Sequence, residues 1–458
     1  MQDPDILVIG SGPGGYRAAV LAALRGLQVG IVERAQWGGC CLNRGCVPKK
    51  DWYHTARVLA AQRLWAARGI AGTVTADLPA AWAHQHQVVD RVRGSYVDYL
   101  KRLGVRQYQG SARFRGPGQI EIVGSDVALR PGHIILATGS VPVVPPLFRG
   151  LKHVLTTDDL YDRPPPLGKR VAVIGGGVIA SEFAFILSML GQDLRWFVRR
   201  PALSGSRFSA PALGALREAW KRHTLVPETA RLGLPRNEGE QVVLPVDGKD
   251  VYFDWILLAT GRTPSVAGLE PDLGGVEWGP DGITLSQGLE TSARGVYAIG
   301  DCAGGTLTAN QALADASRVI EAIVTGTACA ARAPERVPEV LYSALELARV
   351  GLNEDAVEAR DLEPAVGFAA FETSPCALGQ DEPEGFVRLL ADMDAGTLLG
   401  GEIVGAQAGE LIQLLALNLD QPLHALVGGP YNHPSRAEEV LNAVETLAHK
   451  WGLADAVF

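Results

Sequence analysis

The chain has 458 residues, enough for about three domains of ordinary size, each with its own core. Hydrophobic residues make up 47% of the chain and charged residues 20%, which is typical of a soluble globular protein and excludes a disordered one. The 42 Lys and Arg residues against 50 Asp and Glu residues give a formal net charge of −8. This balance does not favour binding to nucleic acid or to an anionic membrane surface.

Two further features concern the compartment of the protein. Residues 131–148 form the longest uncharged stretch, and its prolines and glycines exclude a membrane-spanning helix. The first apolar run begins at Ile6 without a basic segment or a cleavage site before it, which predicts a cytoplasmic protein. Six cysteines are too few for a disulfide-stapled secreted scaffold. Three of them, Cys40, Cys41 and Cys46, are close together, which indicates chemistry.

Two segments repeat the pattern of a strand, a glycine turn, a helix and a second strand. This repeat predicts an α/β protein with two dinucleotide-type units, and the shorter strands and helices that follow residue 337 predict a third domain. The predicted elements in chain order are a strand at 5–10, a helix at 16–27, a strand at 29–32, helices at 47–67 and 81–103, a strand at 171–174, a helix at 180–190, a strand at 194–198 and a final helix at 435–451.

A glycine-rich turn follows the first strand. Gly10, Gly12 and Gly15 have the spacing of a tight turn that lets a pyrophosphate approach the backbone at a helix N-terminus. This match alone is weak, because many strand-to-helix turns contain glycine. Glu33 ends the second strand and supplies the carboxylate that binds ribose hydroxyls in dinucleotide sites. Together these residues predict a dinucleotide site in the first unit.

The second unit has an equivalent turn with Gly175 and Gly177, but the position of the acidic residue is taken by Arg199 and Arg200. Positive charge at this strand end can hold the 2′-phosphate of NADPH, whereas a carboxylate favours NADH. A solvated basic turn is the alternative interpretation. The sequence therefore predicts NADPH as the preferred nucleotide, with NADH as the alternative.

Cys41 and Cys46 lie in the most specific segment of the chain. Their spacing across an Asn-Arg-Gly turn can bring two Cα atoms within the ~4.4–6.8 Å of a disulfide. Pro48 suits the first turn of a helix, which would place Cys46 at the helix N-terminus, where the dipole stabilises a thiolate. A structural metal site or inert thiols are the alternatives; no second cysteine pair lies nearby, and no metal is predicted. For Cys40, packing is a better explanation than a third redox centre.

Motifs in order along the chain carry a resemblance to a known family. They are the two dinucleotide units, the cysteine segment, Ala-Thr-Gly-Ser at 137–140, Tyr-Ala-Ile-Gly-Asp at 297–301, and His433-Pro-x-x-x-Glu438. Together they resemble the flavin-dependent pyridine nucleotide-disulfide oxidoreductases, in the branch of dihydrolipoamide dehydrogenase and glutathione reductase.

The resemblance implies a fold and its boundaries. It implies two Rossmann-like dinucleotide-binding domains, one for FAD and one for NAD(P)H, and an α+β C-terminal domain that forms a homodimer. The implied segments are 1–146 and 268–335 for the FAD domain, 147–267 for the NAD(P)H domain and 336–458 for the dimerisation domain.

The resemblance also implies which residues bind the cofactors. Asp301 would bind the ribityl chain of the flavin, Thr308 would line the isoalloxazine, and Ala112 would meet the adenine through its backbone. The full implied set is Gly10, Gly12, Pro13, Gly14, Gly15, Glu33, Arg34, Gly39, Cys40, Lys50, Ala112, Thr138, Gly139, Gly300, Asp301, Leu307, Thr308, Gly175, Gly177, Val178, Arg199, Arg200, Gly261 and Arg262.

For catalysis, the resemblance implies that electrons pass between NAD(P)H and a disulfide or dithiol substrate by way of the flavin and a Cys41–Cys46 disulfide. The sequence does not fix the direction. Either of two neighbouring lysines would approach the flavin and pair with a glutamate after the second glycine turn. The implied catalytic set is Cys41, Cys46, His433, Glu438, Lys49, Lys50 and Glu182.

His433 and Glu438 resemble the base dyad that, in this family, reaches the disulfide of the other subunit. The active site would then be completed across the homodimer interface. On its own, the same segment could be a helix start with a solvated acidic residue, because proline and acidic side chains are both common there.

The substrate is the least determined feature of the sequence. Two arginines that grip glutathione in glutathione reductases fall on Val20 and Ala316, which argues against glutathione. Tyr96 matches a substrate-pocket tyrosine, with plain packing as the alternative. A lipoyl dithiol, free or on a carrier domain, is therefore the predicted substrate. A glutathione-type reductase of small disulfides is the alternative, and a flavin sensor or scaffold without turnover is a further one.

Overall fold

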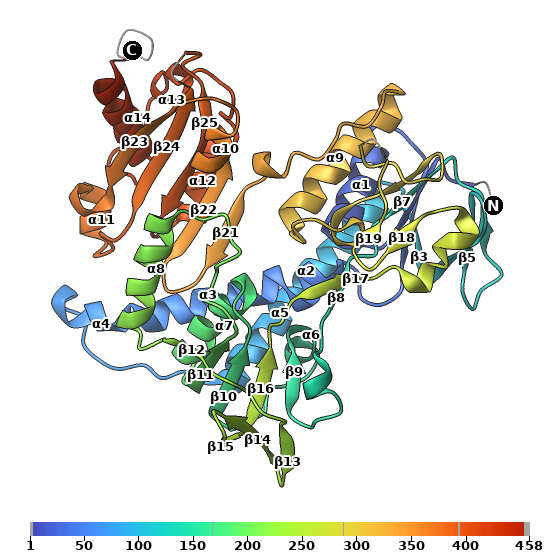
Figure 1. Ribbon diagram of the computed structural model, residues 1–458. Coiled ribbons are helices and arrows are strands. Elements are labelled where there is room, and N and C mark those ends of the chain that lie inside the picture. The colour runs from blue at the N-terminus through green and yellow to red at the C-terminus, as the bar shows by residue number, and fades with distance from the viewer. Residues whose placement is uncertain (1–2, 167, 287, 393, 453–458) are drawn as a thin grey trace. The chain divides into compact units, whose positions relative to one another are not determined.

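The computed structural model describes residues 3–166, 168–286, 288–392 and 394–452. The chain has the predicted α/β fold class (Figure 1) and divides into two compact units. The first unit comprises Met1–Thr55, Ala76–Ile174 and Arg231–Pro334, and the second comprises Ala56–Thr75, Gly175–Ala230 and Glu335–Phe458.

A five-stranded parallel sheet with the order β20-β7-β1-β2-β3 organises the first unit. The strand β1 at the centre of this sheet is a continuous apolar run because both faces of the sheet are covered there, whereas the edge strand β3 is polar. Ile6 and Val8 face a layer that contains α1 and α9, which lie side by side, whereas Leu7 and Ile9 pack against the opposite layer (Figure 1). The elements are β1 (Ile6–Ile9), α1 (Pro13–Leu24), β2 (Val29–Glu33), β3 (Arg106–Gln109), β7 (His133–Leu136), β20 (Val296–Ala298) and α9 (Ala309–Thr325).

The opposite layer is a three-stranded antiparallel sheet with the order β4-β5-β6. The side chain of Phe114, which belongs to this sheet, is fully buried. The first unit also holds a parallel ladder in the order β10-β16-β9 and three smaller antiparallel groups, of which one pairs β18 (Trp278–Gly279) with β19 (Gly282–Ile283). The bounds are β4 (Ala112–Gly116), β5 (Gln119–Ile122), β6 (Ala128–Leu129), β8 (Ser140–Pro142), β9 (Val154–Thr156), β10 (Arg170–Ile174), β13 (Arg236–Glu238), β14 (Gln241–Val246), β15 (Lys249–Phe253), β16 (Trp255–Leu258) and β17 (Arg262–Pro264).

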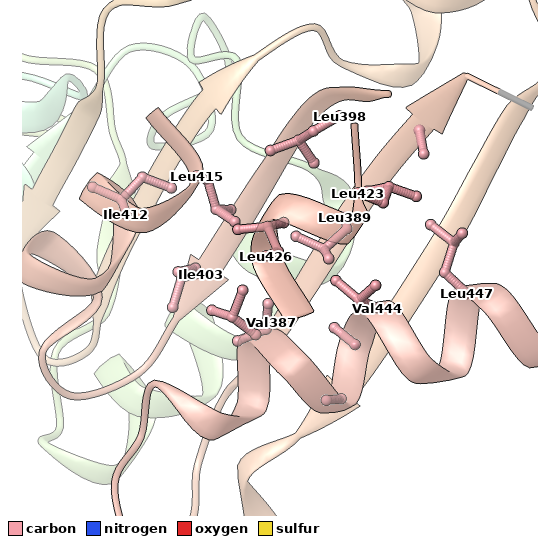
Figure 2. Close-up of a cluster of buried hydrophobic side chains, with 14 of the residues drawn as sticks. Val387, Leu389, Leu398, Ile403, Ile412, Leu415, Leu423, Leu426, Val444 and Leu447 are labelled. Carbon is pink, nitrogen blue, oxygen red and sulfur yellow. The ribbon is translucent and has the colours of Figure 1, made fainter. Parts of the chain in front are cut away.

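The second unit contains a five-stranded sheet with the order β21-β22-β25-β24-β23, in which all neighbouring strands are antiparallel. Figure 2 shows how Val387, Leu389, Val444 and Leu447 form part of its buried core, in which α14 packs against the sheet. The bounds are α7 (Val178–Met189), β11 (Asp193–Val198), α8 (Ala210–Arg222), β12 (Pro227–Thr229), β21 (Glu339–Tyr342), β22 (Glu346–Gly351), β23 (Pro364–Ala370), β24 (Phe386–Asp392), β25 (Leu398–Val404), α12 (Ala408–Ala416) and α14 (Glu438–Trp451).

The helices around the cysteine segment differ from the prediction in detail. The segment before Cys46 is a short helix, α2 (Gly39–Arg44), rather than an open turn, because the Asn43 amide donates to the carbonyl of Gly39 at 2.8 Å and reinforces one helical turn. The long helix expected at 47–67 is broken: α3 (Cys46–Ala60) ends before α4 (Gln62–Trp65). The second predicted helix is α5 (Leu78–Arg102), and a short α6 (Thr157–Asp162) follows β9.

In the described part of the chain, no helix is long and apolar enough to cross a bilayer.

Candidate redox site

The structure joins Cys41 and Cys46 in a disulfide between α2 and α3. Their Cα atoms are 4.7 Å apart, inside the range that a disulfide requires. Gly45 lets the two helices meet closely: a Cβ there would lie 3.2 Å from the Cys40 carbonyl oxygen and from the Cys41 Cα, which is a tight contact. Cys46 is the first residue of α3 and is exposed, as expected for a thiol that a helix N-terminus activates.

Asn43, between the two cysteines, anchors α2 to its surroundings. Its amide nitrogen donates to the Trp37 carbonyl at 3.0 Å, and its amide oxygen accepts from the Arg93 guanidinium of α5 at 2.9 Å. The asparagine is buried, so these hydrogen bonds satisfy its polar atoms. Sequence reasoning missed Arg93 because only the fold brings α5 to this helix.

Cys40 differs from its two neighbours in its surroundings. Burial raises the pKa of the Cys40 thiol to about 11, and the nearby positive charge of Arg262 offsets only part of this effect. A thiol with such a pKa stays protonated at neutral pH and is a poor nucleophile. This supports a packing role for Cys40.

The glycine turn of the first unit is shaped by close backbone contacts. Gly10 has φ +103°, and a Cβ there would lie 2.3 Å from the Ala137 carbonyl oxygen; a Cβ on Gly15 would lie 1.9 Å from the Gly10 carbonyl oxygen. Only glycine fits at these two positions. A Cβ on Gly12, by contrast, would have open space around it at the N-terminus of α1. This open backbone fits the pyrophosphate of FAD.

Glu33 is fixed at the end of β2, beside the same turn. Its carboxylate accepts from the Ser11 backbone amide at 2.9 Å, from the Ser11 hydroxyl at 2.6 Å and from the Ala35 amide at 2.8 Å. Carboxylate oxygens have about four acceptor positions, so capacity remains for a ribose hydroxyl. The arrangement fits the predicted role of Glu33 toward FAD. Arg34, next to it, is exposed and donates to the Ser265 hydroxyl at 3.3 Å.

Asp301 and Arg262, both predicted cofactor residues, are linked through a third residue. The Ser140 hydroxyl donates to an Asp301 carboxylate oxygen at 2.5 Å and accepts from Arg262 Nε at 2.9 Å. Asp158 accepts from the same guanidinium at 2.9 Å. Sequence reasoning named neither Ser140 nor Asp158 as site residues, although Ser140 closes the Ala-Thr-Gly-Ser phrase. The chain thus orients the Asp301 carboxylate before any ligand binds.

Further predicted FAD residues lie at turns or at the starts of helices and strands. Gly139 has φ +71°, with open space where a Cβ would be. Thr308 is the N-cap of α9 and accepts from the Gln311 amide at 3.2 Å, and Leu307 before it has a positive φ. Ala112 is buried at the start of β4.

The glycine turn between β10 and α7 lies beside the predicted arginine pair. Gly177 precedes α7 and has open space where a Cβ would be, and Val178, the first residue of α7, is exposed. A Cβ on Gly176 would lie 3.6 Å from the Arg200 carbonyl oxygen, so the end of β11 lies next to the turn. Arg199 and Arg200 are both exposed. This arrangement fits a nucleotide that carries a 2′-phosphate.

The predicted lysines and glutamate belong to two different helices, α3 and α7. Glu182 is completely buried in α7, and its carboxylate accepts from the Tyr342 amide at 2.9 Å. Lys49 is half-buried and Lys50 is exposed on α3. Pairing of Glu182 with either lysine stays a prediction.

His433 and Glu438 form a hydrogen-bonded pair, with His433 Nδ1 2.8 Å from Glu438 Oε1. The other carboxylate oxygen accepts from the Ser435 amide at 2.7 Å. The hydrogen bond with His433 and then that with Ser435 lower the pKa of Glu438, so the carboxylate stays ionised and orients the imidazole. The histidine side chain is 74% exposed, which suits a group that acts on another subunit.

Tyr96, the predicted substrate residue, stacks on Tyr16 with ring centroids 4.1 Å apart. Burial, and next the neighbouring Tyr96, raise the pKa of Tyr16. The stacking is what the packing alternative predicts; contact of Tyr96 with substrate stays a prediction. Among the described residues, no three His, Cys, Asp or Glu side chains are grouped as a metal site.

Comparison with known proteins identifies the family that the sequence motifs resemble, and the similarity covers almost the whole chain. The family model for pyridine nucleotide-disulphide oxidoreductases matches residues 4–319, and the model for the dimerisation domain of these enzymes matches residues 337–444. A dihydrolipoyl dehydrogenase of Thermus scotoductus is 33% identical over 98% of this chain and 98% of its own length. A glutathione reductase of Burkholderia cepacia is 31% identical over 95% of this chain and 97% of its own.

Solved structures show the same fold. LpdA from Mycobacterium tuberculosis superposes with a TM-score of 0.88 at 23% identity, covering 96% of this chain and 99% of that one. The HOCl-induced flavoprotein disulfide reductase RclA from Escherichia coli superposes with a TM-score of 0.83 at 22% identity, with the same coverage. The chain therefore belongs to the pyridine nucleotide-disulphide oxidoreductases, enzymes that carry FAD and use NAD(P)H, and its redox-active disulfide is Cys41–Cys46.

Proposed function

We propose that this enzyme exchanges electrons between NADPH and a lipoyl dithiol or disulfide. The observation that carries the proposal is the Cys41–Cys46 disulfide at the N-terminus of α3, where Cys46 is an exposed residue. The relatives named dihydrolipoyl dehydrogenase support the lipoyl substrate. Val20 and Ala316 stand at the positions of the two arginines that grip glutathione in glutathione reductases. Both residues are buried in the core, which also supports the lipoyl substrate.

When bound, FAD supplies the two-electron relay between the nicotinamide and the disulfide. The chain's own groups do the thiol chemistry. Two-electron reduction breaks the Cys41–Cys46 bond and leaves two sulfhydryl groups, of which Cys46 is held as a thiolate by the N-terminus of α3. Cys41 attacks a substrate disulfide, forms a mixed disulfide and expels one substrate thiol; Cys46 then closes the original disulfide and expels the second. Run backwards, the same steps oxidise a dithiol.

His433 is the proposed proton carrier for these steps. In the homodimer that the dimerisation domain implies, the imidazole takes the proton of the Cys41 thiol as that sulfur attacks and gives it to the departing substrate thiolate, while Glu438 keeps the imidazole oriented. Glu182 and one of Lys49 and Lys50 are proposed to pair beside the flavin.

The proposed segments are 1–146 and 268–335 for FAD, 147–267 for NADPH and 336–458 for dimerisation. We propose a cytoplasmic enzyme, since a disulfide that must open in every turnover suits a reducing compartment. The lipoyl group can be free or attached to a carrier domain.

The first prediction concerns the substrate. With NAD(P)H or NAD(P)+ as partner, kcat/KM for lipoamide or dihydrolipoamide should exceed that for glutathione disulfide by about tenfold or more, which is about 1.4 kcal/mol of transition-state stabilisation. Steady-state assays on both substrates measure this ratio, and Cys41→Ser, as control, should abolish both activities. Faster turnover of glutathione disulfide would favour the glutathione-type alternative, and no turnover of any disulfide would favour a sensor.

The second prediction concerns the nucleotide. Replacing both Arg199 and Arg200 by alanine should lower kcat/KM for NADPH by about 10- to 100-fold, because charge-assisted hydrogen bonds to a phosphate are worth about 1.5–3 kcal/mol. The value for NADH should change little. Arg217→Ala, which removes an exposed arginine of α8, is the matched control and should affect neither nucleotide. A wild-type enzyme that prefers NADH would show that the basic turn is only solvated.

The third prediction concerns Cys40. After reduction, iodoacetamide should modify Cys46 rapidly at pH 7 and Cys40 hardly at all, because only thiolates react and burial raises the pKa of Cys40 to about 11. Modification of Cys40 should increase as the pH rises toward that value. Mass spectrometry of the digested protein resolves the two sites. Equal labelling of both cysteines at pH 7 would show that Cys40 is an active thiol.

A further inference from the structure

A buried ion pair lies behind the turn that carries Asp301. Asp315, on α9, has a completely buried carboxylate, and the guanidinium of Arg332 meets it at 2.6 Å. The Arg332 side chain is itself 16% exposed. A buried charge pair of this kind is stable only if further hydrogen bonds satisfy both groups. Neither residue belongs to a motif that the function uses.

The further hydrogen bonds of Arg332 all go to one turn. Its guanidinium donates to the carbonyl oxygens of Gly300 at 3.1 Å, Ala303 at 3.1 Å and Gly304 at 2.8 Å. The turn therefore has its first and last carbonyls held by a single side chain. A lysine could not do this, since it lacks the planar fork of donors.

Asp315 holds the same turn from its amide side. One carboxylate oxygen accepts from the Gly300 amide at 3.0 Å, and the other accepts from the Gln311 side chain at 2.7 Å. All these groups are buried, so each hydrogen bond replaces one that water would otherwise make.

The turn needs this support because its backbone is irregular. Gly300, the first residue of the short 3-10 helix Gly300–Ala303, and Gly304, the residue that follows it, both have positive φ, +66° and +67°. Asp301 lies within this turn, and its carboxylate points to the Ser140 hydroxyl. Any shift of the turn would move the Asp301 carboxylate with it.

We propose that Arg332 and Asp315 are positioning residues that fix the turn Gly300–Gly304 and thereby hold Asp301 in place for the ribityl chain of FAD. The inference rests on the proposed role of Asp301 toward FAD. Arg332 and Asp315 act only through the turn and touch no reacting atom.

The test is a double-mutant cycle on FAD retention. Holoenzymes are diluted, and the fluorescence of released flavin gives the dissociation constant. Arg332→Leu and Asp301→Ala should each raise this constant by about tenfold or more, and the double variant should be little worse than either single one, because residues that act as one unit are not additive. Arg332→Lys, which keeps the charge beside Asp315 but loses the fork, should give an intermediate effect and covers the case in which Arg332→Leu does not fold.

The matched control is Arg25→Leu, which removes an exposed ion pair to Glu321 on the same helix α9 and should leave the dissociation constant unchanged. Additive effects of the Arg332 and Asp301 substitutions would overturn the inference, since Arg332 would then support the fold without acting through Asp301. An unchanged dissociation constant in Asp301→Ala would instead contradict the proposed role of Asp301 itself.

Discussion

The redox chemistry of this chain depends on the junction between two helices at Gly45. The two cysteines can bond only if the end of α2 folds back tightly against the start of α3, and the lack of a Cβ at Gly45 permits that approach. The same junction makes Cys46 the first residue of the 15-residue helix α3, whereas Cys41 lies within the six-residue helix α2, so the two sulfurs become chemically different. The backbone conformation of this segment therefore gives Cys41 and Cys46 different chemical roles, independently of any bound cofactor.

The first glycine turn sets a second constraint of the same kind. Gly10 and Gly15 admit no side chain, whereas Gly12 leaves its backbone open, so the turn is both tight and accessible. Glu33 and Asp301, from distant parts of the sequence, are each held by hydrogen bonds from neighbouring serines. The chain thus fixes its cofactor-binding carboxylates by its own contacts, which lowers the entropy lost on binding.

Much of this could be predicted from the sequence. The strands β1 and β10 contain continuous apolar runs, and the glycine turns after them have fixed spacings, so both βαβ units were predicted close to their observed bounds. The break after Ala60 and the helix α2 were not predicted; in α2, the hydrogen bond of the Asn43 side chain to the Gly39 carbonyl stabilises a turn that the hydrophobic pattern does not indicate. Arg93, Ser140 and Arg332 were also missed, since each acts through residues far away in the sequence.

The observations that favour a lipoyl substrate are independent of those that favour NADPH. The similarity to dihydrolipoyl dehydrogenases extends over the whole chain, whereas the basic pair after β11 is a local feature that favours NADPH. The proposed substrate and the proposed nucleotide both require that the Cys41–Cys46 disulfide is reduced and formed again in each turnover.

Anaerobic titration with NADPH, followed by visible absorption, tests this disulfide cycle most directly. Wild-type enzyme should develop a long-wavelength band of thiolate-to-flavin charge transfer after reduction. Cys41→Ser, which leaves Cys46 as a thiolate, should show the band before any NADPH is added, and Cys46→Ser should never show it. A band in Cys46→Ser, or none in the wild type and in Cys41→Ser, would contradict the account.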